Sequence, residues 1–207
     1  MQPSRLSRSQ QARFASCGAL VLKGALAAEI QALEDAFERV FGAWSGPAGQ
    51  RASMTGFLEL DPVLSGLQSH GLINRLQASL VPGKSLVQTA STGNLHSGDN
   101  PWHVDGVGTD SIHVRINVYL DPVAVGRGCL LVIPGSHRYG PWQSGPAPDP
   151  IVRLPDWYDP GGTWIGLESE PGDVVVIDRR IIHASLGGGL RRRMFNLDLK
   201  EGKGRAA

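Results

Sequence analysis

The chain has 207 residues, of which 41% are hydrophobic and 19% charged, and its formal net charge is +1. This length fits one domain with its own core, so we expect a single domain over residues 1–207. No segment approaches the ~18 unbroken apolar residues of a membrane span, and the balanced charge lacks the basic excess of nucleic-acid-binding proteins. We therefore expect a small-molecule substrate and neither membrane nor nucleic acid as partner. Nothing in the sequence indicates an oligomeric state.

The two cysteines, Cys17 and Cys129, are too few for a disulfide framework. Residues 1–13 contain arginines but no apolar run typical of a signal peptide. These features predict a cytoplasmic protein.

The first part of the chain is predicted to be mostly helical. Residues 1–12 are polar and aperiodic, which predicts a loose tail, and residues 19–22 form a short apolar run typical of a strand. Residues 24–82 should be mostly helical, with a loop over 42–56. Two amphipathic helices are expected there because apolar residues recur at helical spacing, namely Ile30, Leu33, Phe37, Val40 and Phe41, then Leu72, Ile73, Leu76 and Leu80.

Residues 84–200 have the sequence pattern of a β-barrel or sandwich, in which short alternating or β-branched runs are separated by turn residues. In the clearest strand, 111–120, Arg115, Asn117 and Tyr119 share one face and apolar residues the other. Further strands are expected over 129–133, 174–177, 180–183 and 192–199. Residues 139–162 are rich in Pro, Gly and Asp, which predicts a long loop able to cover a site.

His103 and Asp105 lie two positions apart, so on an extended segment both side chains point to the same side. The pair alone is explained as well by a turn in which Asp105 bonds the backbone. His183, at the end of the predicted strand 180–183, supplies a possible third ligand. Together the three would form a two-histidine, one-carboxylate triad, which leaves coordination positions open and suits non-haem iron(II).

Three consecutive arginines, Arg191, Arg192 and Arg193, lie at the start of the last predicted strand. Strand alternation places Arg192 on the face of Asn196 and Asp198, and its two neighbours on the other. We predict that Arg192 points inward, where a guanidinium can bind a carboxylate through two hydrogen bonds. A solvated basic turn is the alternative.

These segments resemble the phytanoyl-CoA dioxygenase family. The likeness rests on Trp102-His103-Val104-Asp105, on the run from Gly128 to His137 that ends in Pro-Gly-Ser-His, and on Gly172-Asp173 leading to His183-Ala184-Ser185 and an arginine. The resemblance covers the chain from about Phe14 to Lys200 and implies a mainly β fold, a double-stranded β-helix of the jelly-roll or cupin-like kind. It also implies that the N-terminal helices pack on one sheet.

The resemblance further implies iron(II) as metal, 2-oxoglutarate as co-substrate and O2 as oxidant. His103, Asp105 and His183 would be the iron ligands, and Arg192 with Ser185 would anchor the distal carboxylate of 2-oxoglutarate. Two departures stand out: Arg127 replaces a usual Asn, and the short gap after His183 leaves Arg191 and Arg193 as rival anchors.

The implied activity is a dioxygenase that hydroxylates or otherwise oxidises a small molecule and releases succinate and CO2. A carboxylate at Asp105 favours hydroxylation, or another oxidation such as desaturation, over halogenation, because related halogenases have a small residue there. Two alternatives are a non-catalytic metal- or ligand-binding protein on the same barrel, and a cupin-type metalloenzyme without 2-oxoglutarate. The second would normally show His-x-His and a glutamate.

Further residues are expected near the site. Asn117 and Arg115 would line the barrel interior and contact co-substrate or substrate, unless Arg115 pairs with an acid such as Asp110. Asn94 and His96 would sit in a loop before the metal pair, within reach of substrate.

Overall fold

The computed structural model describes residues 5–42, 52–96, 98–105, 111–138, 152–153, 160–188 and 192–202. The helices are α1 (Arg8–Cys17), α2 (Ile30–Phe41), α3 (Pro62–Gly66) and α4 (Gly71–Leu80), with short 3-10 turns η1 (Phe57–Leu60), η2 (Leu67–Ser69) and η3 (Ser136–Arg138). The strands are β1 (Ala19–Leu22), β2 (Ala52–Thr55), β3 (Leu86–His96), β4 (Asn100–Val104), β5 (His113–Tyr119), β6 (Leu130–Val132), β7 (Val152–Arg153), β8 (Ile165–Leu167), β9 (Val174–Asp178), β10 (His183–Ser185) and β11 (Arg192–Glu201).

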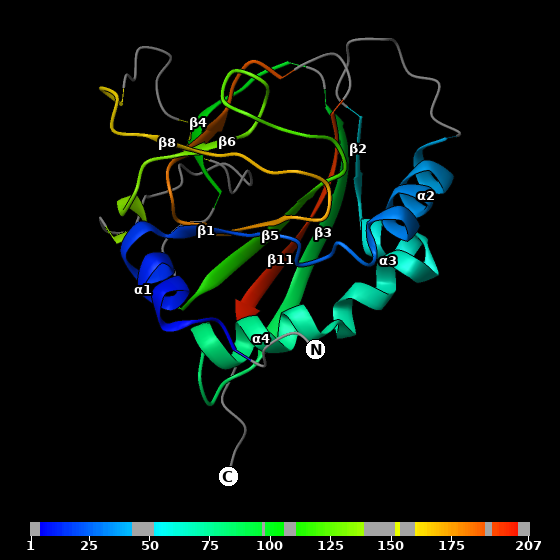
Figure 1. Ribbon diagram of the computed structural model, residues 1–207, viewed down its shortest axis with the longest axis horizontal. Coiled ribbons are helices and arrows are strands. Elements are labelled where there is room, and N and C mark those ends of the chain that lie inside the picture. The colour runs from blue at the N-terminus through cyan, green and yellow to red at the C-terminus, as the bar shows by residue number, and fades with distance from the viewer. Residues whose placement is uncertain are drawn as a thin grey trace.

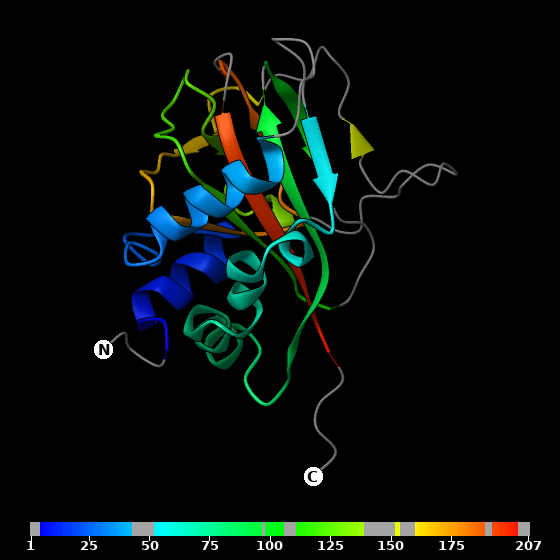
Figure 2. The ribbon, with the colours of Figure 1, turned by 90° about the vertical axis from the view of Figure 1, so that its right-hand side faces the viewer.

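The strands form two antiparallel sheets that face each other (Figure 1). Among the described residues, the larger sheet has six strands in the order β1-β9-β5-β11-β3-β2, and the smaller has five in the order β7-β4-β10-β6-β8. Strands distant in the sequence therefore become neighbours, as β11 lies between β3 and β5. In Figure 2, β2 lies beside β3 at the edge of the larger sheet.

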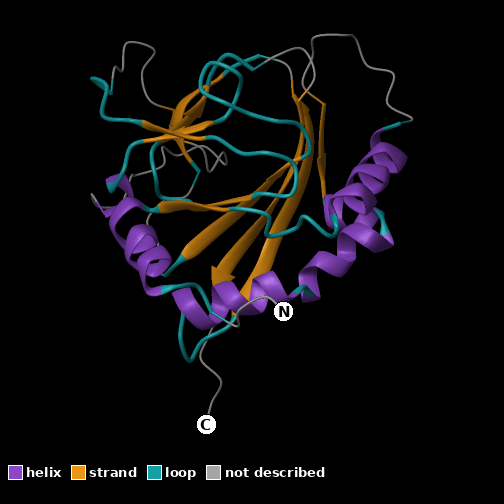
Figure 3. Ribbon diagram, viewed as in Figure 1, coloured by secondary structure: helices purple, strands orange, loops and turns teal. Residues whose placement is uncertain are grey.

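The helices pack on the outer face of the larger sheet (Figure 3). Phe37 of α2 and Leu76 of α4 belong to one buried apolar cluster with Ile116 of β5 and Leu197 of β11. This burial is the main stabilising term of the fold, because apolar area removed from water contributes ~25 cal/mol per Å². The predicted architecture, mainly β with N-terminal helices on one sheet, is confirmed.

A second buried cluster lies between the two sheets. It joins Tyr119, Val175 and Met194 of the larger sheet to Leu131 and Leu167 of the smaller one. Alternate residues of β5 and β11 therefore face either the helices or the space between the sheets, as strand geometry requires. Within the described ranges, no helix is long and apolar enough to cross a membrane.

The loose tail predicted for residues 1–12 is wrong from Arg8 onward, where α1 begins. Ser7 caps the helix by accepting from the Gln10 amide, and the Gln10 side chain accepts from the Ser7 amide in return. Leu6 and Phe14 are buried and hold the helix to the core. A capping box and a few anchoring residues thus replace the broad apolar stripe that the prediction required.

Three other expectations change. Thr55 belongs to β2, which pairs with β3 inside the predicted 42–56 loop. The predicted strand over 180–183 is a turn in which the Ile181 amide donates to the Asp178 carbonyl (3.0 Å), and the strand begins only at His183. Asn94 and His96 both lie in β3 rather than in a loop. Apart from β7 and residues 160–162, the predicted 139–162 loop lies outside the described residues.

Candidate active site

His103, Asp105 and His183 come together between the two sheets. His103 of β4 and His183 of β10 are register partners on adjacent strands, and Asp105 directly follows β4. One ligand atom from each residue lies within 4.8 Å of the others. All three side chains are buried. The structure therefore assembles the three residues that the sequence singled out.

Each histidine is oriented by a backbone carbonyl two residues before it. Nδ1 of His103 lies 2.7 Å from the Pro101 carbonyl, and Nδ1 of His183 lies 2.9 Å from the Ile181 carbonyl. A carbonyl only accepts, so both Nδ1 atoms carry the proton and both Nε2 atoms keep a lone pair. These Nε2 atoms lie 3.6 and 3.5 Å from the Asp105 carboxylate. Such fixed tautomers are typical of metal-binding histidines.

Electrostatics keep this group in the protonation states that metal binding requires. Burial opposes ionisation of Asp105, but the charges of Arg115, His183 and His103 outweigh it and lower the pKa of the carboxyl to about 2. Burial lowers the pKa of His183 to about 4, and the adjacent His103 adds to that shift. At neutral pH the site thus offers one carboxylate and a neutral imidazole at His183.

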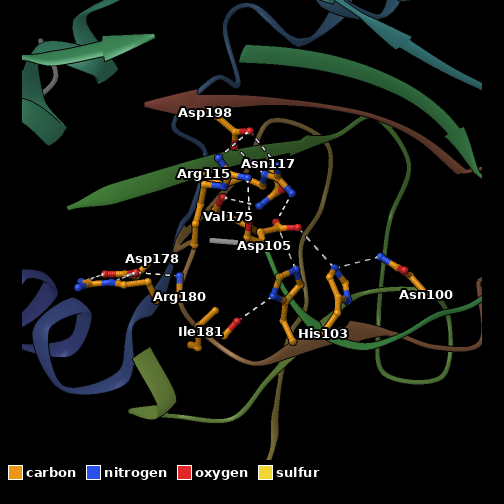
Figure 4. Close-up of polar contacts among 12 residues, drawn as sticks. Asn100, His103, Asp105, Arg115, Asn117, Val175, Asp178, Arg180, Ile181 and Asp198 are labelled. Carbon is orange, nitrogen blue, oxygen red and sulfur yellow. Dashed lines mark hydrogen bonds and ion pairs between the residues drawn. The ribbon is translucent and has the colours of Figure 1, made fainter. Parts of the chain in front are cut away.

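Arg115 holds the Asp105 carboxylate from the opposite side (Figure 4). Its Nε and Nη2 donate to the two carboxylate oxygens of Asp198 at 2.7 and 2.8 Å, and its Nη1 donates to Asp105. Arg179 completes the network, because its Nη2 donates to the Asp105 carbonyl (3.1 Å) and its Nη1 lies 3.5 Å from Asp198. Arg115 therefore forms ion pairs with both Asp105 and Asp198. Asp110, the acid expected as an alternative partner, lies outside the described residues.

Arg192 forms a second polar centre on the same inner face. Its Nη1 donates to Ser185 Oγ (2.6 Å) and to the Gly128 carbonyl, and Ser185 Oγ also donates to that carbonyl (2.9 Å). The side chain is buried, yet in the described part of the chain no acidic side chain pairs with it and its Nε has no partner. Its guanidinium carbon lies 6.0 Å from the centre of the Tyr119 ring. A buried guanidinium without a counter-ion is suited to bind an anionic ligand.

The rival arginines are distinguished by their surroundings. Arg193 faces away from the site and forms ion pairs with Asp121 (2.8 Å) and Glu38 (3.0 Å). Arg191 lies outside the described residues. The predicted inward position of Arg192 is confirmed.

Asn117 lies beside Arg115 on β5 (Figure 4). Its side chain is buried, and the only partner of its Nδ2 in the described chain is the Val175 carbonyl at 3.5 Å. The side chain of His96 is not among those described. His137 lies in η3 with its ring against Gly18, and it is not part of the cluster of His103, Asp105 and His183.

Sequence reasoning missed Asp198 and Arg179 as parts of the site. A signal for Asp198 was present, because strand alternation already placed it on the inner face with Arg192. What the sequence lacked was the register that sets Asp198 opposite Arg115.

Known proteins share this sequence pattern and fold. The family model for phytanoyl-CoA dioxygenase matches residues 14–194. A search of curated protein sequences gave no match.

Three solved structures illustrate the likeness of fold. The epimerase SnoN, in complex with Fe3+, alpha ketoglutarate and nogalamycin RO, is 18% identical with a TM-score of 0.74, covering 92% of this chain and 81% of that one. AviO1 from Streptomyces viridochromogenes is 23% identical with a TM-score of 0.70, covering 98% of each chain. EctD from S. alaskensis, with 2-oxoglutarate and 5-hydroxyectoine, is 21% identical with a TM-score of 0.72, covering 94% of this chain and 76% of that one.

Proposed function

The chain belongs to the phytanoyl-CoA dioxygenase family of iron(II)- and 2-oxoglutarate-dependent oxygenases, and from that premise we propose which of its residues carry the reaction. We propose that His103, Asp105 and His183 bind iron(II). The observation that carries this assignment is that each of these residues offers one ligand atom within 4.8 Å of the other two. The donor set fits the metal, because two imidazoles and one carboxylate on one side leave coordination positions open for ligands.

The proposed co-substrate anchor is Arg192 with Ser185. Its support is a buried guanidinium that Ser185 and Gly128 orient but no described acid neutralises. A planar guanidinium binds a carboxylate through two parallel hydrogen bonds and keeps its charge when buried. The distal carboxylate of 2-oxoglutarate would supply the missing counter-ion. Asn117 is proposed to donate a further hydrogen bond to the co-substrate from β5.

The proposed reaction is oxidation of a small molecule, with hydroxylation as its simplest form. When bound, iron(II) supplies the oxidising chemistry in which 2-oxoglutarate and O2 give succinate and CO2 while the substrate is oxidised. The protein's own residues bind and orient these reactants. Asp105 occupies the place that related halogenases leave for chloride, so halogenation is not proposed.

The cytoplasm is the proposed compartment. Cys17 and Cys129 are both free and buried in the structure. Unpaired cysteines are typical of proteins in a reducing environment.

Anaerobic titration with iron(II) and 2-oxoglutarate tests both halves of the proposal. The wild type should develop the weak visible charge-transfer band of the chelated co-substrate. His103→Ala should lose the band, and Arg192→Ala should need about 10- to 100-fold more 2-oxoglutarate to reach it, because it loses a charge-assisted contact. Arg193→Ala is the matched control, since this arginine pairs with surface acids instead. A wild type without a band, or equal losses in Arg192→Ala and Arg193→Ala, would refute the assignment.

A further inference from the structure

A row of uncharged polar residues crosses the inner face of the larger sheet, from β5 to the edge strand β2. Asn117 of β5 lies opposite Asn196 of β11, Asn196 lies opposite Thr92 of β3, and Thr92 lies opposite Thr55 of β2. Residues opposite each other in antiparallel strands project to the same face. With strands ~4.8 Å apart, this inner row is about 14 Å long.

The neighbouring residues of β3 show which face the row occupies. Gly93 faces the helices, because a Cβ there would lie 2.2 Å from the Phe57 ring. Ser91 also faces the helices, since its Oγ accepts from the Leu58 amide at 3.1 Å. Thr92 and Asn94 alternate with these residues and therefore face inward.

The amides of the inner row are buried with few protein partners. Asn196 is 6% exposed, and within the described residues its Oδ1 has no hydrogen-bond partner. Asn117 is 3% exposed and makes one long bond of 3.5 Å. Buried polar groups cost free energy unless they are bonded, so this surface favours a ligand that offers hydrogen bonds.

Charged groups on the same face are already compensated. Asp105 and Asp198 are paired with Arg115 and Arg179. The proposed function assigns Arg192 to 2-oxoglutarate. Within the described ranges a charged substrate would therefore find no free counter-ion on this face, and an acyl chain would cover amides and hydroxyls without bonding them.

We propose that Asn196, Thr92 and Thr55 of the inner row, beyond the co-substrate contact at Asn117, form the substrate subsite and that they select an uncharged molecule bearing several hydroxyl or amide groups. This inference rests on the proposed function, because the row begins at Asn117, two residues along β5 from the arginine that binds the proposed iron ligand Asp105. The hydroxyls of Thr92 and Thr55 lie towards the sheet edge, where Thr55 is exposed. Acyl chains, carboxylic acids and amines are the classes that the row disfavours.

The experiment uses the full chain with iron(II) and 2-oxoglutarate. Co-substrate binding and basal succinate release are measured first. Three sets of compounds at equal concentration follow: uncharged glycosides and polyols, amino and carboxylic acids, and medium-chain acyl compounds. Only the uncharged set should raise succinate release above the basal rate.

Two substitutions connect that stimulation to the row. Thr92→Val keeps the side-chain shape and removes one hydroxyl, so it should raise KM for the stimulating compound about three- to tenfold without changing half-saturation by 2-oxoglutarate. Thr55→Val repeats the test at an exposed position where folding is not at stake. Thr163→Val is the control, because its hydroxyl is in an exposed turn and donates to the Pro160 carbonyl (2.6 Å).

Three results overturn the inference: stimulation by charged or acyl compounds alone, no stimulation by any uncharged compound, or an unchanged KM in both row variants. Failure of the proposed function looks different. In that case 2-oxoglutarate does not bind the iron-loaded protein at all, and the premise of the inference falls with it.

Discussion

Arg115 and Asp198 lie directly opposite each other on β5 and β11, and their two-point ion pair fixes the guanidinium that also holds Asp105. Arg115 therefore has no freedom to follow a ligand. Its charge keeps the Asp105 carboxylate ionised at a depth where burial alone would favour the neutral acid. The network thus keeps the Asp105 carboxylate ionised and in position in the absence of a metal ion.

Arg115→Met should destabilise the metal-free protein by about 3–5 kcal/mol, because removing one partner leaves two buried carboxylates without their main counter-ion. Urea denaturation in the presence of a chelator measures the free energy of unfolding. Lys84→Met is the control, since its pair with Glu201 is half-exposed on the lysine side and should be worth about 1 kcal/mol or less. Equal losses in the two variants would show that the Arg115 network is not a special stabilising element.

Gly128→Ala should raise the 2-oxoglutarate concentration for half-saturation about 10- to 100-fold, the effect of losing a charged hydrogen bond. A Cβ at Gly128 would lie 2.2 Å from Nη1 of Arg192, so the guanidinium must move. Gly126→Ala is a closely matched control, because its φ of 74° resembles the 77° of Gly128 but nothing lies within 4 Å of its Cβ. Both variants carry the same backbone strain. If they bind 2-oxoglutarate equally well, Arg192 is not the anchor.

The chelator-treated protein should lose stability in two stages as the pH falls. The pKa of His183 is about 4 in the folded state against an ordinary 6.5, so the unfolded chain binds more protons in this interval and the free energy of unfolding decreases from pH 6.5 to pH 4. The pKa of Asp105 is about 2 against 3.8, so its contribution is present above pH 3.8 and is lost towards pH 2. Urea denaturation across this range measures both stages. His183→Gln should reduce the upper stage without removing it, because burial also lowers the pKa of His113 and of His137. An unchanged upper stage in that variant contradicts the assignment.

Ser7→Ala should lower the free energy of unfolding by about 1 kcal/mol, the usual cost of losing a helix N-cap. Thermal or urea denaturation measures the loss. Ser16→Ala, near the other end of α1, is the control because its hydroxyl only donates to the Arg13 carbonyl (3.3 Å). No difference between the two variants would mean that the capping box does not hold α1 in place.

Much of the site was predictable because strand alternation depends on position alone. The inward placement of Arg192 and Asn117, and the shared side of His183 and Ser185, required only the two-residue period of a strand. The pairing of Arg115 with Asp198 was not predictable in the same way. It depends on which residues of β5 and β11 face each other, and a single sequence does not specify that register.

The errors of prediction occurred where a few contacts outweigh composition. α1 has polar composition, but the Ser7–Gln10 capping box and buried Phe14 secure it. The segment before His183 contains the β-branched residues Ile181 and Ile182, which favour a strand. Instead the Asp178 carboxylate accepts a hydrogen bond from the Arg180 amide (2.9 Å) and the chain turns there. In both places local hydrogen bonds from a short polar side chain decided the backbone path.

His183 and Ser185 occupy the two ends of β10, a strand of three residues. Under the proposed assignment, one end holds the metal and the other helps to hold the far carboxylate of the co-substrate. Two steps along a strand span about 6.6 Å, and that pitch is fixed by backbone geometry. The strand therefore fixes the distance between the metal ligand and the residue that helps to hold the far carboxylate. A diacid one carbon longer or shorter would reach either the metal or the arginine in good geometry, but not both.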